Sequence, residues 1–351
     1  MCKNPSKPIH KALSFGLQRT NKNMNSITET VNWGIIGCGN VCEVKSGPAF
    51  NKVDNSKLVA VMRRDLDKAK DYANRHNVPL FYNDAAALIN NENVNAIYIA
   101  TPPSTHELYT EMALKADKPV YVEKPLTINA ASCERMISME KNYDNKVTVA
   151  HYRRGLPLFN KVKQLVNEGA VGKVKLVQLK ILQPFKSKLI ADTGDNWRVN
   201  PEISGGGLFH DLAPHQLDIL YWIFGEPEEV YVKAVNQGKH YNAPDLTMVQ
   251  IGFSNDIYFN GVWNFNVGES VAADECEILG DAGSIRFSFF RGNPVEVVNA
   301  NGKEVLELEF PVNIQRPHIN NVVKFFRGEG PNPCSLEDAY VTMKILDKAV
   351  L

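Results

Sequence analysis

The chain contains the stretch Val31-Asn32-Trp33-Gly34-Ile35-Ile36-Gly37-Cys38-Gly39-Asn40-Val41, in which an apolar run ends at two spaced glycines. The apolar run predicts a short buried strand, and a helix is expected after it. Gly37 permits a tight turn, Gly39 lets the backbone approach a pyrophosphate, and the first N–H groups of the helix favour phosphate binding. Cys42 replaces the usual third glycine or alanine but is small enough to keep strand and helix close. The stretch is typical of a dinucleotide-binding unit.

Two glycines alone are a weak signal, but the alternation that follows them supplies the missing context. Strands are expected at 57–62, 96–101, 119–122 and 146–150, and helices at 65–76, 104–116 and 129–142. Strands that alternate with helices predict an α/β fold with a doubly wound parallel sheet, here a Rossmann domain over residues 31–150. Ligands of such sheets bind beyond the carboxyl ends of the strands, where Gly37, Arg63, Thr101 and Glu123 stand.

The second half of the chain has a different pattern. A linking helix is expected at 156–168 and two closing helices at 314–327 and 336–351. Turn residues such as Ser254-Asn255-Asp256 and Asp281-Ala282-Gly283 separate alternating runs, which favours antiparallel hairpins with one sheet face covered and one free. Residues 151–351 are therefore predicted to form a substrate-binding and oligomerisation domain, with a homodimer or homotetramer built through the free face. The expected strands are 173–182, 229–235, 246–253, 257–264, 275–279, 284–289 and 304–310.

Ionisable residues gather after the glycines at 205–207. On a helix, Asp211, His215 and Asp218 would share one stripe, while the glycines would admit a ligand or another backbone to the first turn. Such a stripe indicates a substrate pocket, although a His-Asp pair is also common as a solvated surface pair. With His210 the segment contains metal-ligand residue types, but the spacing matches no zinc signature, and no metal is expected.

Four motifs together resemble the Gfo/Idh/MocA oxidoreductases from about Val31 to the C-terminus: Gly37-Cys38-Gly39-Asn40, Thr101-Pro102-Pro103-Ser104-Thr105-His106, Glu123-Lys124-Pro125 and the segment from Gly205 to Asp218. The resemblance implies a Rossmann domain followed by an α/β domain with a large, open, mostly antiparallel sheet. It implies reversible hydride transfer between NAD(P) and a hydroxyl or carbonyl carbon of a sugar or polyol. By position, Lys124 corresponds to the family's catalytic lysine, and Asp211 and His215 to its catalytic aspartate and histidine.

General chemistry is consistent with these roles. Alcohol oxidation needs a base for the hydroxyl proton, which we assign to His215, and Lys124 can stabilise the developing alkoxide. Asp211 would either orient His215 or bind a substrate hydroxyl. For Glu123, a contact with the cofactor ribose and a structural ion pair are both open. The residues expected at the cofactor are Gly37, Gly39, Asn40, Val41, Arg63, Arg64, Thr101, Pro102, His106, Glu123 and Lys124; those at the substrate are Lys124, Arg198, Asp211 and His215.

The segment Asp195-Asn196-Trp197-Arg198 is a candidate rim for a polyhydroxylated or anionic substrate, although Trp197 can equally be a packing residue. Two other functions remain open. A glycosidase of the same superfamily would use tightly held NAD for transient oxidation, and a sensor would bind the cofactor without catalysis. The complete set of Lys124, Asp211 and His215 argues against the sensor.

Residues 62–65 bear on the choice of cofactor. NAD-selective sites place an acid about 20 residues beyond the glycines, where it binds the ribose hydroxyl and repels a 2′-phosphate. This chain has Arg63 and Arg64 there, which favours NADP(H) over NAD(H). The alternative is that Asp65 reaches the ribose, or only caps the next helix while both arginines are solvated.

Composition limits the remaining classes. At 351 residues, with 44% hydrophobic and 22% charged residues, the chain is long enough for two domains. Lys plus Arg and Asp plus Glu both number 39, so no overall charge indicates nucleic acid or an anionic membrane as partner. Six cysteines without a C-x-x-C pair favour free thiols and a cytoplasmic location. Residues 1–30 lack an apolar signal-peptide region and are expected to be a disordered extension.

Overall fold

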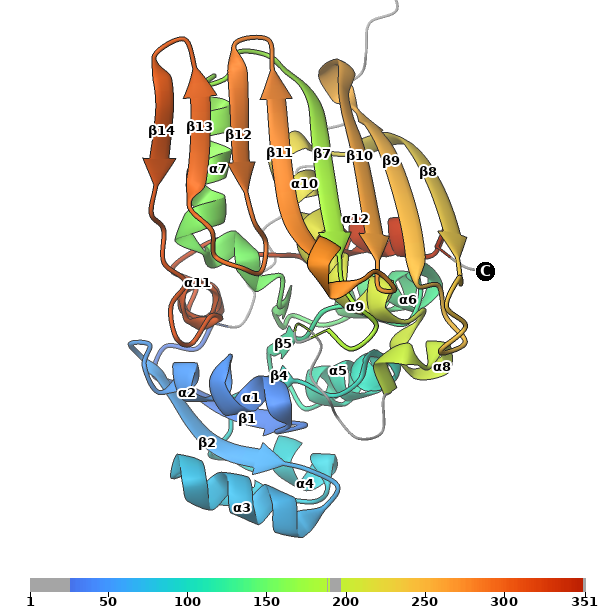
Figure 1. Ribbon diagram of the computed structural model, residues 1–351. Helices are drawn as coiled ribbons and strands as arrows, with labels where there is room; N and C mark the ends of the chain where they lie inside the picture. Colours follow the sequence, from blue (N-terminus) through green and yellow to red (C-terminus); the bar gives the residue numbers. More distant parts are fainter. Residues whose placement is uncertain (1–25, 188, 190–196, 350–351) are drawn as a thin grey trace, which may run out of the picture.

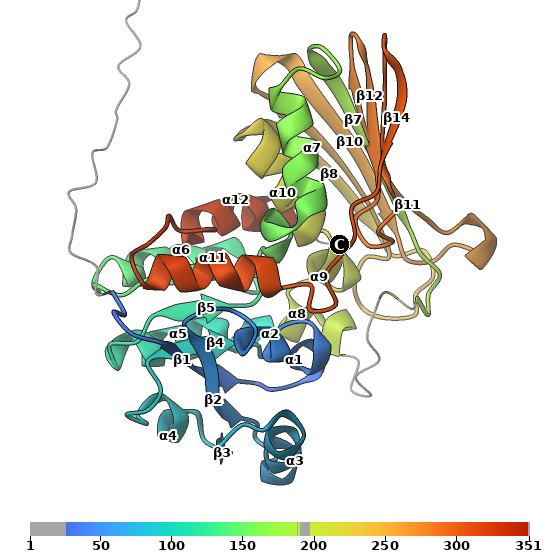
Figure 2. The same ribbon diagram turned by 90° about the vertical axis from the view of Figure 1, so that its left-hand side faces the viewer.

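The computed structural model describes residues 26–187, 189 and 197–349, which form two domains around two β-sheets (Figures 1 and 2). The first sheet has six strands in the order β3-β2-β1-β4-β5-β6, and every pairing in it is parallel. This confirms the predicted Rossmann sheet. The strands are β1 (Val31–Ile36), β2 (Ser56–Met62), β3 (Leu80–Tyr82), β4 (Ala96–Ile99), β5 (Val120–Val122) and β6 (Val147–Val149).

Alternate residues of these strands face two separate cores. Trp33 and Tyr98 belong to one buried cluster, while Ile36 and Ile99 belong to the other, so both faces of the sheet are covered. The short elements β3, α2 and α4 escaped the sequence analysis. The helices of this domain are α1 (Asn40–Val44), α2 (Gly47–Phe50), α3 (Leu66–His76), α4 (Ala85–Ile89), α5 (His106–Lys115) and α6 (Ala130–Glu140), with the 3₁₀ turn η1 (Pro103–Thr105) before α5.

The helix predicted after the glycine turn is interrupted early. Its first part, α1, ends at Val44, and α2 begins at Gly47 with Pro48 at its start. Proline has no N–H to continue the first helix. The Val44 carbonyl instead accepts a hydrogen bond from Asn313 Nδ2 at 2.6 Å.

The second sheet has eight strands in the order β14-β13-β12-β11-β7-β10-β9-β8. Only β7 and β10 pair in parallel, and the other neighbours are antiparallel, so the predicted mostly antiparallel sheet is confirmed. The sequence analysis did not find β13. The strands are β7 (Val174–Leu182), β8 (Pro227–Val235), β9 (Leu246–Phe253), β10 (Ile257–Asn264), β11 (Ala273–Gly280), β12 (Gly283–Phe287), β13 (Val295–Asn299) and β14 (Gly302–Leu306).

Helices α7 and α10 lie against one face of this sheet (Figure 2). Among the described residues, no helix lies over the other face. The helices of the second half are α7 (Pro157–Asn167), α8 (Pro201–Ser204), α9 (Leu208–Leu212), α10 (Pro214–Phe224), α11 (Arg316–Phe326) and α12 (Leu336–Leu346), with the 3₁₀ turns η2 (Tyr152–Gly155), η3 (Trp197–Val199), η4 (Ser254–Asp256) and η5 (Glu269–Val271).

The division of the chain at residue 150 is only approximate, because the C-terminal part returns to the Rossmann domain. Helix α11 packs in the cluster that contains Trp33, and the rings of Trp33 and Phe326 are 5.5 Å apart. The start of the described chain also docks there, since the Ile27 N–H donates to the Phe326 carbonyl at 3.0 Å. The predicted disordered extension is therefore wrong for residues 26–30, and residues 1–25 lie outside the described part.

Two further observations concern the whole chain. Among the described residues, none of the helices has both the length and the apolar character needed to cross a membrane. The five cysteines within the described residues, Cys38, Cys42, Cys133, Cys276 and Cys334, are buried and unpaired.

Candidate active site

The predicted cofactor residues lie at one edge of the Rossmann sheet. Ile36 is level with Met62 and with Ile99, and Ile99 with Val122, so the residues that follow these strands gather at the same edge. Gly37 has a φ of +91°, and a Cβ there would lie 2.7 Å from Thr101 Cγ2. At Gly39 a Cβ would meet only the Gly37 carbonyl, at 3.9 Å. The turn is therefore packed against the loop after β4 at Gly37 and free of close neighbours at Gly39, which fits a backbone that faces a dinucleotide phosphate.

The loop after β4 is held from behind by His106. This histidine is fully buried, with its ring nitrogens 3.0 Å from the Leu126 carbonyl and 2.8 Å from the Thr101 carbonyl. It joins the loop of Thr101 and Pro102 to the segment that follows Lys124. Thr101 and Pro102 themselves are half-buried at the strand edge. A direct cofactor contact by His106 was predicted, but its full burial does not support it.

Glu123 lies in a buried hydrogen-bond network. Its Oε1 accepts from the Tyr98 hydroxyl at 2.5 Å and from Gln315 Nε2 at 2.7 Å, while Oε2 accepts from the Lys124 backbone at 3.2 Å. These partners are neutral, so they do not form the ion pair considered from the sequence. The network fixes the backbone that carries Lys124 and ties it to the returning C-terminal segment. The cofactor contact of Glu123 stays a prediction.

The residues after β2 separate into two groups. Asp65 caps α3, since its Oδ1 accepts from the Lys68 N–H at 3.1 Å, and its Oδ2 pairs with Lys68 Nζ at 3.5 Å. Arg64 is exposed and Arg63 half-buried. Burial raises the pKa of the Cys38 thiol, in the glycine turn, to about 11, and the positive charge of Arg63 opposes this rise. Arg63 therefore lies close enough to the glycine turn for its charge to act there.

The glycines at 205–207 bring two loops together. Gly205 has a φ of +91°, and a Cβ there would lie 2.5 Å from the Ile128 carbonyl oxygen. The close approach predicted from the sequence is therefore made here by another backbone. The helix predicted after these glycines is divided at Ala213, because Pro214 begins a new helix. Asp211 lies on α9, whereas His215 and Asp218 lie on α10.

Lys124 and Asp211 meet across the two domains. Lys124 Nζ donates to the Asp211 carbonyl at 2.7 Å and to its Oδ1 at 2.9 Å, while Oδ2 accepts from Arg198 Nε at 3.1 Å. The side chains of Lys124 and Asp211 are 10% and 16% exposed, so the pair is shielded but reachable. Burial would raise the pKa of Asp211, but Lys124 and Arg198 oppose it and the net pKa is lowered. Asp211 thus stays ionised and fixes the lysine.

His215 lies beside this pair in an aromatic surround. Its ring is 5.2 Å from that of Tyr152 and 5.7 Å from that of Phe290, edge to face in both cases. Its buried Nδ1 has no hydrogen-bond partner among the described residues. Burial, and then the charges of Lys124, Arg153 and Lys45, lower the pKa of His215 well below 6.5. The imidazole is therefore neutral at neutral pH.

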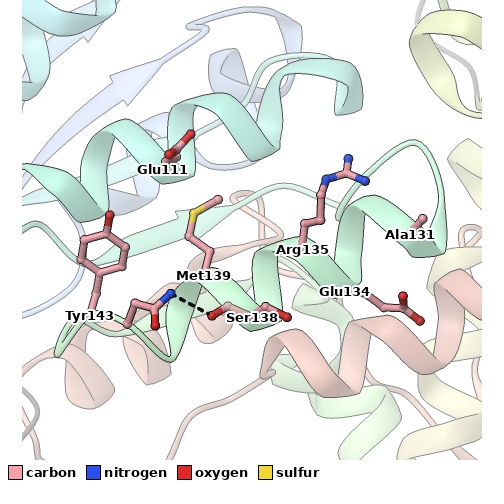
Figure 3. Close-up of a pocket in the computed structure, with 8 residues that line it drawn as sticks. Glu111, Ala131, Glu134, Arg135, Ser138, Met139 and Tyr143 are labelled. Carbon is pink, nitrogen blue, oxygen red and sulfur yellow. Dashed lines mark hydrogen bonds between the residues drawn. The ribbon is translucent and has the colours of Figure 1, made fainter.

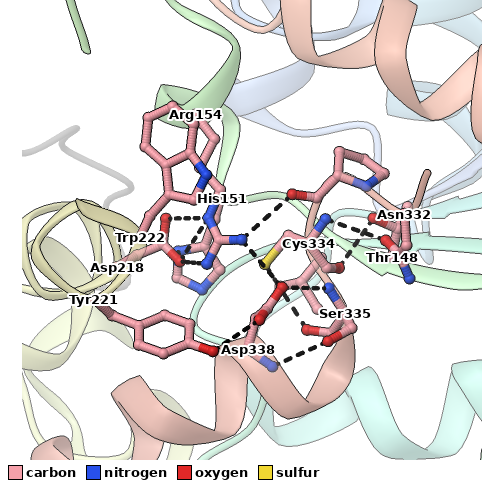
Figure 4. Close-up of polar contacts among 12 residues, drawn as sticks. Thr148, His151, Arg154, Asp218, Tyr221, Trp222, Asn332, Cys334, Ser335 and Asp338 are labelled. Atoms are coloured by element: carbon pink, nitrogen blue, oxygen red, sulfur yellow. Dashed lines mark hydrogen bonds and ion pairs between the residues drawn. The ribbon is translucent and has the colours of Figure 1, made fainter. Parts of the chain in front are cut away.

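The structure does not support one of the two roles considered for Asp211, or a place for Asp218 in the site; a contact of Asp211 with a substrate hydroxyl stays a prediction. Asp211 bonds Lys124 and Arg198, and no hydrogen bond joins it to His215 within the described residues, so it does not orient the histidine. Asp218 is engaged by another segment, since its Oδ1 accepts from Arg154 Nη2 at 2.7 Å (Figure 4). The spacing of Asp218 on the predicted helix could not reveal its partner, because that partner is Arg154, a buried arginine from another segment.

The buried cluster in Figure 4 also contains metal-ligand types. Ligand atoms of His151, Asp218 and Cys334 lie within 4.8 Å of one another. Arg154 Nε, however, lies 3.1 and 3.0 Å from the two Asp218 oxygens. A cation at this position would compete with a guanidinium, so we read the cluster as a structural network.

Several residues near the site were not singled out from the sequence, among them Lys45, Tyr152, Arg153 and Phe290. The only signal was for Tyr152 and Arg153, which belong to the segment His151-Tyr152-Arg153-Arg154 that closes the Rossmann half; Lys45 and Phe290 had none. Arg198, half-buried, does reach the site, and its guanidinium lies 4.5 Å from the Trp197 ring centre. Asp195 and Asn196, predicted with it as a substrate rim, lie outside the described residues.

A surface pocket between α5 and α6 lies apart from the site (Figure 3). It is bordered by Glu111 and Arg135, which pair with Lys115 at 2.7 Å and with Glu107 at 2.6 Å. It contains none of the predicted site residues.

Comparisons with known proteins agree with this arrangement. Residues 31–151 match the oxidoreductase family with an NAD-binding Rossmann fold, GFO_IDH_MocA, and residues 159–286 match the GFO/IDH/MocA C-terminal domain. The chain is 46% identical over 320 residues to Oxidoreductase P35 of Formosa agariphila, covering 90% of this chain and 97% of that protein. The chain therefore belongs to the Gfo/Idh/MocA family of NAD(P)-binding oxidoreductases.

More distant relatives have named activities. Inositol 2-dehydrogenase of Acidothermus cellulolyticus is 28% identical over 261 residues, which cover 73% of this chain and 72% of that protein. Levoglucosan dehydrogenase in complex with NADH superposes with a TM-score of 0.81 at 21% identity, over 92% of this chain and 96% of that one. At that identity the likeness concerns the fold.

Proposed function

We propose that this protein is a dehydrogenase or reductase that moves a hydride between NAD(P)(H) and a CH–OH or C=O carbon of a sugar, polyol or related small molecule. The observation that carries the proposal is the shielded Lys124–Asp211 pair beside the neutral, buried His215. The named inositol dehydrogenase among the relatives supports the substrate class.

The chain's residues supply proton transfer and charge stabilisation. A nicotinamide dinucleotide held at the turn of Gly37 and Gly39 would supply the hydride acceptor for oxidation of the carbinol carbon. His215, neutral at its low pKa, accepts the hydroxyl proton as the C=O bond forms. Lys124, held by Asp211, donates a hydrogen bond to the same oxygen and stabilises its negative charge. In the reverse direction His215 returns the proton.

Two features support NADP(H) as the preferred cofactor over NAD(H). Asp65 is engaged in capping α3 and pairing with Lys68, so it does not stand free for a ribose hydroxyl. Arg63 is half-buried near the glycine turn, and guanidinium groups bind phosphate through charge-assisted hydrogen bonds.

A substrate panel tests the proposal. The purified protein is incubated with sugars, polyols and their oxidised forms and with each cofactor, and absorbance of the reduced nicotinamide is followed. Net, substrate-dependent cofactor turnover is expected. Release of an aglycone from a glycoside without net reduction would favour the glycosidase, and cofactor binding without turnover would favour the sensor.

A further inference from the structure

Arg153 is a buried cation that the proposed chemistry does not use. It follows β6 in η2 and is only 3% exposed. Its Nη1 donates to the Phe289 carbonyl at 2.5 Å, and its buried Nε has no hydrogen-bond partner among the described residues. A guanidinium has five N–H donors, so the described residues use only a small part of its hydrogen-bonding capacity.

The charge of Arg153 also lacks a direct carboxylate partner in the described part of the chain. The acid whose charge acts on it is Asp274, but the Asp274 oxygens accept from the backbone N–H groups of Phe289, Phe290 and Arg291 at 2.7 to 3.0 Å. Arg153 and Asp274 are thus linked only through the Phe289 peptide. A buried cation without a paired anion is costly, which makes an unpaired arginine in a protein interior an unusual feature.

This arginine borders the candidate active site. Its guanidinium lies 4.7 Å from the ring centre of Phe290 and 5.5 Å from that of Tyr152. These are the two rings that flank His215, at 5.7 and 5.2 Å. Arg153 and His215 therefore contact the same two aromatic side chains.

In this region the cations Lys124, Arg198, Arg153 and Lys45 outnumber the carboxylates of Asp211, Glu123 and Asp274. Asp211 is already paired with Lys124 and Arg198, and the charge of Lys45, which follows α1, also acts on it. Arg153 adds a further cation that Asp211 does not pair with within the described residues. A substrate that brings its own negative charge would balance this excess.

We propose that the substrate is a sugar acid or related polyhydroxy acid whose carboxylate binds Arg153 beside His215. A carboxylate matches the planar guanidinium and can accept two parallel hydrogen bonds from it. This inference depends on the proposed dehydrogenase function and specifies its substrate class.

The first test uses the wild-type protein with matched compounds. Glucose, glucuronate and methyl glucuronate are compared, together with the galactose and mannose series and the corresponding 6-phosphates. The acid in at least one series should exceed both its neutral sugar and its methyl ester in kcat/KM by about 10- to 100-fold, the factor expected for hydrogen bonds to a charged group. Equal or higher values for the neutral compounds, or for the phosphates, would overturn the proposal.

The second test uses variants. Arg153→Gln should lower the acid-to-ester ratio of kcat/KM toward one, because it keeps a polar side chain but removes the charge. Arg291→Gln changes an exposed arginine nearby, whose Nη2 donates to the Ala272 carbonyl, and should leave the ratio unchanged. An unchanged ratio in a folded Arg153→Gln protein would contradict the assignment. Should that variant fail to fold, the wild-type comparison still decides.

A binding measurement separates this inference from the proposed function. Each acid and its methyl ester are titrated into the wild-type protein with bound cofactor and followed by calorimetry. Tighter binding of an acid supports the inference even without turnover, in which case only the proposed reaction fails. If neutral sugars are turned over and acids are preferred neither in kinetics nor in binding, the proposed dehydrogenase function stands and the carboxylate site at Arg153 is refuted.

Discussion

His215 differs from an ordinary histidine because it is buried among cations. Burial, followed by Lys124, Arg153 and Lys45, lowers its pKa well below 6.5. A base with a lowered pKa stays unprotonated as the pH falls through 6.5, so kcat/KM for oxidation should remain flat from about pH 8 to about pH 6 and fall only below that. A pH–rate profile measures this, and a decline centred at 6.5 would contradict it. Lys45→Gln, which removes one cation, should move the decline to higher pH.

Substitutions of His215 and Lys124 test their catalytic roles. His215→Ala and Lys124→Met should each lower turnover by roughly 10²- to 10⁴-fold and leave cofactor affinity within a few-fold, because both groups act mainly in the transition state. Asp211→Asn should be milder, since it keeps an oxygen near Lys124. Steady-state kinetics and cofactor titration give the two quantities separately. Turnover close to wild type in both the His215 and Lys124 variants would refute the assignment.

The cofactor preference rests on Arg63 and Arg64. Replacing both by alanine should weaken NADP(H) binding by about 2–4 kcal/mol, at roughly 1–2 for each charged group, and leave NAD(H) nearly unchanged. Asp65→Ser is the matched control, because serine keeps a capping oxygen for α3 and removes only the charge. Fluorescence titration of both cofactors decides the matter. The alternative, in which Asp65 binds the ribose hydroxyl, would be favoured by either of two results. One is tighter binding of NAD(H) than of NADP(H) to the wild type, and the other is a loss of NAD(H) binding in Asp65→Ser.

Single residues could be predicted from sequence where a motif fixes their place. Lys124 and Asp211 follow such motifs, and the structure brings them within hydrogen-bond distance. Arg153 could not be recognised, since an Arg-Arg pair in sequence has no signal for burial. Its surroundings come from Phe159 and Phe290, which lie on separate segments. Asp218 was misread for the same reason.

Among the helices, α10 is anchored by a buried ionic network. Arg154 of η2 donates to Asp218 of α10 at 2.7 Å and to Asp338 of α12 at 3.1 Å (Figure 4). Since Asp218 follows His215 by about one helical turn, the network also supports the position of His215. Breaking a buried pair leaves a charge without compensation, which is far more costly than losing a surface pair.

Arg154→Leu should therefore lower the free energy of unfolding by about 3–5 kcal/mol. The matched control is Lys115→Met, which breaks the exposed Lys115–Glu111 pair of α5 and should cost far less than the loss of the buried pair. Urea denaturation of both variants measures the difference. Similar small losses in the two proteins would show that the network does not stabilise α10.

Whole elements were predictable where the apolar pattern is long. The strands β9 and β10 have the predicted bounds, and the turn between them contains Asn255 at a φ of 63°, as the turn residues indicate. Elements of three to five residues, such as β3 and α4, are too short to show a repeating pattern of apolar residues in the sequence. The division of the helix at Ala213 had a local signal in Pro214, which the charge pattern around it obscured.

At the scale of the whole molecule, the sequence predicted two sheets but not how the chain joins them. Helix α11 has an apolar face, and sequence pattern cannot show which core will receive it. In the structure this face completes the Rossmann core, while Gln315, just before α11, bonds Glu123 beside Lys124. The C-terminal segment thus helps to fix the relative position of the two domains, and with it the Lys124–Asp211 contact.

The free face of the second sheet provides the basis for an assembly. Large apolar side chains point outward on its β8–β10 side, where Tyr231, Met248 and Tyr258 are 64%, 41% and 55% exposed. Charged side chains, among them the Arg286–Glu277 pair at 3.0 Å, occupy neighbouring strands of the same face. A broad sheet face with clustered aromatic residues is rare on a monomer. We therefore predict a homodimer or homotetramer formed through this face.

Substitutions on this face test the assembly directly. In a twofold symmetric contact each outward residue occurs twice, so Tyr258→Asp should place two new carboxylates in the interface and shift the protein toward monomers. Leu108→Asp on α5, a site that is 53% exposed but lies on the other domain, should leave the mass unchanged. Light scattering at micromolar concentration measures both proteins and the wild type. A monomeric wild type would refute the assembly, whereas an oligomer that Leu108→Asp disrupts and Tyr258→Asp does not would place the contact on the Rossmann domain.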